Sequence, residues 1–127
     1  MSRINISQRL KKFIKEQIHS VFSLEVLLLL YRKQSRSLTA SEVASELGIE
    51  TDIVQQQLSE LATTDLVSTT TGAVSKYRYA PVDEELAAIV DQLALTYSKQ
   101  RVPILTLILT EHPDRIRGFA EAYRLIE

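Results

Sequence analysis

The amino-acid sequence predicts a mainly α-helical protein that carries one small β-hairpin. Three observations lead to this fold class. Apolar residues recur at helical spacing along most of the chain, only three Gly and three Pro interrupt it, and one β-branched segment around Gly72 alternates like two strands. The length of 127 residues, with 45% hydrophobic and 24% charged side chains, fits one ordinary globular domain.

We expect residues 1–127 to form that single domain in three parts. Residues 1–20 form an N-terminal helical arm, residues 21–81 form the helix-and-hairpin body, and residues 82–127 form C-terminal helices that provide a dimer interface. The dimer is expected because the last part has more apolar residues than a single small domain needs, among them Leu105, Leu107, Ile108 and Leu109.

The first two helices are predicted over residues 8–18 and 21–33. Ser7 can cap the first helix, in which apolar residues recur at helical spacing. Residues 26–31 are apolar all round, so the second helix should be buried on most sides. This run is far shorter than the roughly 20 residues that span a bilayer.

A short helix is predicted between two strong end signals. Thr39 and Glu42 form a T-x-x-E capping box, and Gly48 supplies the left-handed residue that ends the helix. After a turn at residues 49–51, a longer helix is predicted over residues 52–63, with Ile53, Val54, Leu58 and Leu61 on its inner face.

The hairpin and three more helices complete the prediction. Strands are expected over residues 67–71 and 74–79, joined at Gly72. Helices follow from Asp83 to about Lys99 and from Pro103 to Leu109. A last helix after His112 carries the apolar residues Ile116, Phe119, Ala120, Tyr123 and Leu125.

Charge is distributed unevenly along the chain, although the net charge is only -1. Residues 1–36 carry eight basic and two acidic side chains. Residues 39–65 carry six acidic side chains and no Lys or Arg. Because the acidic stretch includes the helix predicted over residues 52–63, it opposes the approach of a polyanion to that helix.

Residues 38–81 resemble the winged helix-turn-helix of bacterial regulators of the MarR and ArsR kind. The resemblance is carried by the capped helix from Thr39 to Gly48, by residues 53–61 as the recognition helix, and by Asp65-Leu66-Val67 entering the wing. It implies a DNA-binding transcriptional regulator. The helices predicted before and after these residues are additions to this winged helix-turn-helix. The chain departs from that pattern because Glu50 replaces the usual Ser or Thr cap, Asp65 replaces the usual Gly, and the recognition helix has no Arg or Lys.

The residues needed for catalysis or for a cofactor are not present in a recognisable pattern. There is no cysteine, the two histidines His19 and His112 lie far apart, and the three glycines form no phosphate-binding loop. We therefore expect no enzyme activity, no metal and no cofactor. No apolar signal core follows the first methionine, so we expect a cytoplasmic protein without membrane contact.

Double-stranded DNA is the partner that the residue types favour. The outward face of the helix predicted over residues 52–63, together with the turn before it, should carry the polar side chains Thr51, Gln55, Gln56 and Ser59. Gln can pair with adenine N6 and N7. On the second strand, Lys76 and Arg78 should share one face, from which they can reach phosphates.

A second interpretation remains open at this point. A winged helix with an acidic recognition face can instead serve as a protein-interaction module that binds no DNA. The two interpretations predict different surfaces. A regulator should place its cations around the helix of residues 52–63 and the wing. An interaction module should instead expose an apolar patch rimmed by that acidic helix.

Overall fold

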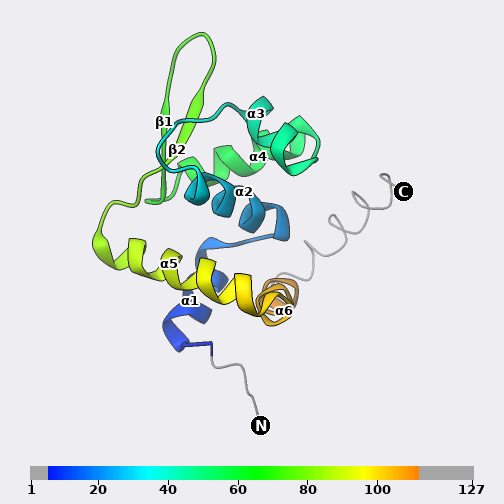
Figure 1. Ribbon diagram of the computed structural model, residues 1–127, viewed down its shortest axis with the longest axis vertical. Coiled ribbons are helices and arrows are strands. Elements are labelled where there is room, and N and C mark those ends of the chain that lie inside the picture. The colour runs from blue at the N-terminus through cyan, green and yellow to red at the C-terminus, as the bar shows by residue number, and fades with distance from the viewer. Residues whose placement is uncertain (1–5, 112–127) are drawn as a thin grey trace. The chain divides into compact units, whose positions relative to one another are not determined.

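A computed structural model describes residues 6–111, and Figure 1 shows its helices and its one hairpin. The described residues belong to two compact units. One is the continuous segment Phe22–Leu86. The other unit combines the described residues up to Val21 with those from Ala87 onward. The mainly helical fold with a small hairpin is confirmed, and it is that of a winged helix-turn-helix.

The unit Phe22–Leu86 contains three helices and the hairpin. The helices are α2 (Val21–Arg32, which starts one residue before the unit), α3 (Ala40–Leu47) and α4 (Thr51–Ala62). In α2 the run from Val26 to Leu30 is buried on every side, as its apolar composition predicts. Helices α3 and α4 pack against each other and are joined by only three residues.

Both ends of α3 form as the sequence predicts. The backbone N–H of Glu42 donates to Thr39 Oγ1 over 3.1 Å, while the N–H of Thr39 donates to Glu42 Oε1 over 2.9 Å. Gly48 has a φ of 67°, and its N–H donates to the carbonyl of Ala44. Helix α4, by contrast, starts after Glu50, which makes no side-chain capping bond.

The hairpin consists of β1 (Val67–Thr70) and β2 (Lys76–Tyr79), which pair antiparallel with Val67 opposite Tyr79. The second strand was expected to begin at Val74, and this boundary is wrong. Val74 is 61% exposed in the loop that joins the strands, because residues 71–75 have no covered face to pack on. The outer edge of β2 also pairs with Leu38 through two backbone bonds of 2.8 Å to Tyr77.

The second unit contains α1 (Gln8–Gln17), α6 (Arg101–Glu111) and most of α5 (Glu84–Lys99). Ser7 caps α1 by accepting from the N–H of Leu10, and α1 packs against α6. Asp83 caps α5 in the same way, by accepting from the N–H of Leu86 over 2.8 Å. The expected last helix after His112 lies outside the described residues.

We expect Thr39→Ala to lower the free energy of unfolding by about 1 kcal/mol, because it removes the capping hydroxyl of α3. Urea denaturation followed by circular dichroism measures the change. Ser41→Ala is the matched control, since Ser41 is exposed inside the same helix and Ala is a good helix former. Equal stability of the two variants would show that the capping box contributes nothing.

Candidate nucleic-acid interface

The outward face of α4 is polar and accessible. All four of the residues predicted to contact bases, Thr51, Gln55, Gln56 and Ser59, are exposed. The opposite face buries Val54, Gln57, Leu58 and Leu61 at the spacing of one helical stripe. The burial of Gln57, which is 4% exposed, was not predicted, because a polar residue inside an apolar stripe gives no sequence signal.

Gln55 is tied to the hairpin. Its side-chain nitrogen Nε2 donates to the hydroxyl of Tyr77 over 2.9 Å and to Ser59 Oγ over 3.2 Å. Tyr77 lies on β2, 22 residues further along the chain. This contact joins the recognition helix to the wing through the amide nitrogen of Gln55.

Side chains alternate along β2 as predicted. Tyr77 and Tyr79 are buried, and Lys76 and Arg78 are exposed. The register places Ser68 of β1 opposite Arg78 and Thr70 opposite Lys76. Residues directly opposite each other share a face, so each wing cation has a hydroxyl beside it. The sequence could not reveal these two hydroxyls, because the pairing depends on the register.

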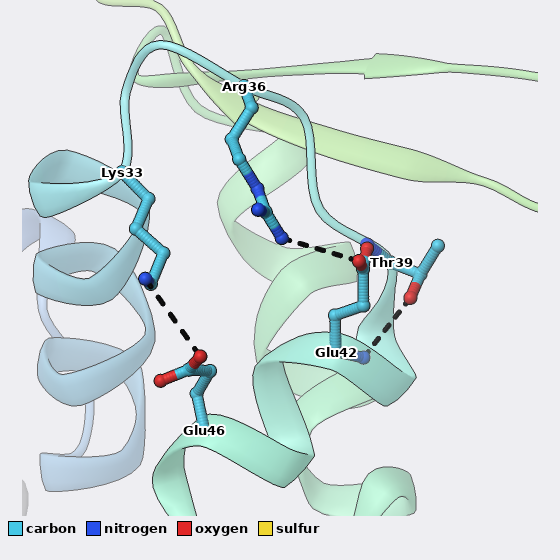
Figure 2. A network of polar contacts seen from close by, with 5 residues as sticks. All are labelled: Lys33, Arg36, Thr39, Glu42 and Glu46. Carbon is cyan, nitrogen blue, oxygen red and sulfur yellow. Dashed lines mark hydrogen bonds and ion pairs between the residues drawn. The ribbon is translucent and has the colours of Figure 1, made fainter.

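The wing cations lie close to the connection between α2 and α3. Arg78 Nε donates to the backbone carbonyl of Gln34 in this connection over 3.1 Å, and the charge of Lys76 acts on Glu42. Two further cations meet α3, as Figure 2 shows: Arg36 approaches Glu42 at 3.4 Å and Lys33 approaches Glu46 at 3.9 Å. We call Lys33, Arg36, Lys76 and Arg78 the basic cluster.

Glu42 is the acidic centre of this arrangement. The pKa of its carboxyl is lowered, first by the hydrogen bond from the Thr39 backbone and then by the Thr39 hydroxyl and the charges of Arg36 and Lys76. Glu42 is therefore ionised at neutral pH. The side chains of both ion pairs are well exposed, and exposed ion pairs contribute little to stability, so neither cation is held strongly.

Within residues 6–111, no group of three or more His, Asp or Glu side chains is arranged to hold a metal ion. His19 contacts the carbonyl of Glu16 at 3.0 Å, and His112 lies outside the described part. No helix in these residues is both long and apolar enough to cross a membrane.

The arrangement agrees with a comparison of the chain with known protein families. Residues 18–92, more than half of the chain, match the family described as winged helix-turn-helix transcription repressor, HrcA DNA-binding. No curated protein matches the chain. The expected winged helix-turn-helix regulator is thus confirmed, although the match names the HrcA domain and not the MarR or ArsR kind. The chain belongs to the family of winged helix-turn-helix transcription repressors with the HrcA DNA-binding domain.

Proposed function

We propose that this DNA-binding domain inserts α4 into the major groove and places its basic cluster on the phosphate backbone. The observation that carries the proposal is the exposed face of α4, which offers amide and hydroxyl groups, the types that pair with base edges. In helix-turn-helix proteins the first helix of the pair crosses the backbone while the second lies in the groove. Three members of the basic cluster, Lys33, Arg36 and Lys76, act on carboxylates of α3, the first helix of this pair.

The positions of charge also support DNA over the protein-interaction alternative. That alternative needs an exposed apolar patch bordered by the acidic helices. Among residues 6–111, the exposed large hydrophobic residues Val74, Val82, Leu95 and Val102 all lie outside α3 and α4. Two carboxylates of the acidic stretch, Glu42 and Glu46, are paired with cations. These ion pairs reduce the repulsion that the sequence predicts between the acidic stretch and DNA phosphates.

A homodimer formed through the terminal helices would double the phosphate contacts and match a palindromic site. Support comes from α5 and α6, where Leu95 is 57% and Val102 is 71% exposed. Four residues of α6 were expected to supply a partner surface between them: Leu105, Leu107 and Leu109 are half-buried, and Ile108 is buried. A second copy that covers exposed apolar surface of this kind removes it from water, and this burial stabilises the dimer.

Binding to random duplex DNA at about 50 mM salt, followed by salt titration, tests the proposal. We expect Lys76→Ala and Arg78→Ala to weaken binding to all sequences and to lower the salt slope by about 1 each, because each removes a phosphate contact. Gln56→Ala is the matched comparison: it should leave the salt slope unchanged and erode the preference among sequences. Wild-type protein without affinity for any duplex would exclude the proposal and favour the protein-interaction alternative.

Glu42→Gln is expected to tighten binding to random DNA roughly two- to fivefold, because it releases Arg36 from a surface ion pair. Gln still completes a capping box, so α3 should keep its stability. Electrophoretic mobility shifts of wild type and variant measure the change. Glu84→Gln, which removes the same charge from the first turn of α5, controls for net charge. If Glu42→Gln and Glu84→Gln tighten DNA binding equally, the gain comes from net charge and not from the release of Arg36.

We expect multi-angle light scattering to show a dimer at micromolar concentration. Val102→Glu should shift the protein towards the monomer, because it places a charge on the exposed apolar surface of α6. Val74→Glu makes the same change at the hairpin loop and should leave the dimer intact. Wild-type protein that stays monomeric at micromolar concentration would contradict the dimer.

A further inference from the structure

The amide nitrogen of Gln55 makes two hydrogen bonds within the protein. A glutamine side chain has two N–H donors on Nε2 and one carbonyl oxygen that only accepts. Nε2 of Gln55 donates to the Tyr77 hydroxyl over 2.9 Å and to Ser59 Oγ over 3.2 Å, so it has one acceptor for each of its two hydrogens. The side chain is exposed, so Oε1 is the part of it that can meet a base.

Tyr77 holds this orientation because its own position is restricted. Its side chain is only 6% exposed, and its backbone N–H and C=O both bond Leu38 over 2.8 Å. It also pairs with Thr69 across the hairpin. The hydroxyl therefore cannot follow a movement of Gln55 without disturbing β2. Ser59, one turn further along α4, fixes the second hydrogen from the same helix.

We propose that Gln55 reads DNA as a hydrogen-bond acceptor only, and that Tyr77 is the positioning residue that imposes this. Oε1 accepts from the exocyclic amino groups in the major groove, adenine N6 and cytosine N4. Guanine and thymine present acceptors there and are rejected. The usual two-bond contact of Gln with adenine needs an N–H directed to N7, and Tyr77 and Ser59 occupy both hydrogens. The inference rests on the proposed function.

The test starts from a synthetic duplex library with a random core of about 20 base pairs, enough for two half-sites one helical turn apart. Selection with wild-type protein yields its preferred sites, and repetition with Gln55→Ala identifies the position that Gln55 reads. We expect adenine and cytosine there in similar amounts, each bound about fivefold more tightly than guanine or thymine, the usual effect of one hydrogen bond.

Tyr77→Phe then removes the hydroxyl and keeps the buried ring. One N–H of Gln55 becomes available for adenine N7, so adenine should be preferred over cytosine by about fivefold. Ser59→Ala releases the other N–H without a change in the wing and should produce the same shift. Tyr79→Phe removes a hydroxyl from the same strand and should leave the base preference unchanged.

Gln55→Glu provides an independent measurement, because a carboxylate can only accept. The inference predicts that this variant binds DNA more weakly but keeps cytosine at the same position, where Glu accepts from N4. Loss of any preference for cytosine would contradict the acceptor role.

The remaining outcomes separate the inference from the proposed function. Selection of guanine or thymine at the Gln55-dependent position would overturn the inference. These bases need a donor, so Oε1 of Gln55 would then accept from the hydroxyls of Tyr77 and Ser59 and its amide nitrogen would contact the base. An unchanged ratio of adenine to cytosine in both folded variants, Tyr77→Phe and Ser59→Ala, would overturn the role of Tyr77. Selected sites in which no position responds to Gln55→Ala would overturn the inference alone. No enrichment by the wild type would overturn the proposed function and the inference together.

Discussion

The pairing of β2 on both of its edges is the constraint on which the interface depends. One edge pairs with β1 and the other with Leu38, through two backbone bonds of 2.8 Å to Tyr77. Because side chains alternate along a strand, this pairing directs Tyr77 to α4 and Lys76 and Arg78 to the opposite face. A slip of one residue would exchange these faces and remove both arrangements at once.

The electrostatic arrangement explains how an acidic helix-turn-helix can approach DNA. Lys33 and Arg36 come from the basic N-terminal stretch and lie against Glu46 and Glu42 of the acidic one. These pairs are exposed and weak, so a phosphate can replace a carboxylate at little cost. Affinity for DNA in such an arrangement depends steeply on salt, because the contacts between exposed cations and phosphates are screened by salt ions.

A recognition helix without cations has only neutral and acidic groups with which to contact base edges, and the neutral ones exposed on α4 are amides and hydroxyls. Amides and hydroxyls gain little non-specific affinity from phosphates, so on α4 they contribute through orientation. The hydroxyl of Tyr77 orients Gln55, while Ser68 and Thr70 lie opposite the wing cations. In the proposed mode of binding the wing combines two tasks: its inner face orients Gln55 and its outer face carries Lys76 and Arg78.

The local features of the fold were determined by the sequence alone. Thr39 and Gly48 end α3 through bonds between near neighbours, and helical or alternating periodicity predicted the buried faces of α4 and β2. Only the tertiary structure decided the burial of Gln57, the hydrogen bond of Gln55 to a residue 22 positions away, and the ion pairs between α3 and the connection that follows α2. These contacts join separate elements, and their geometry depends on packing and strand register, which local periodicity does not encode.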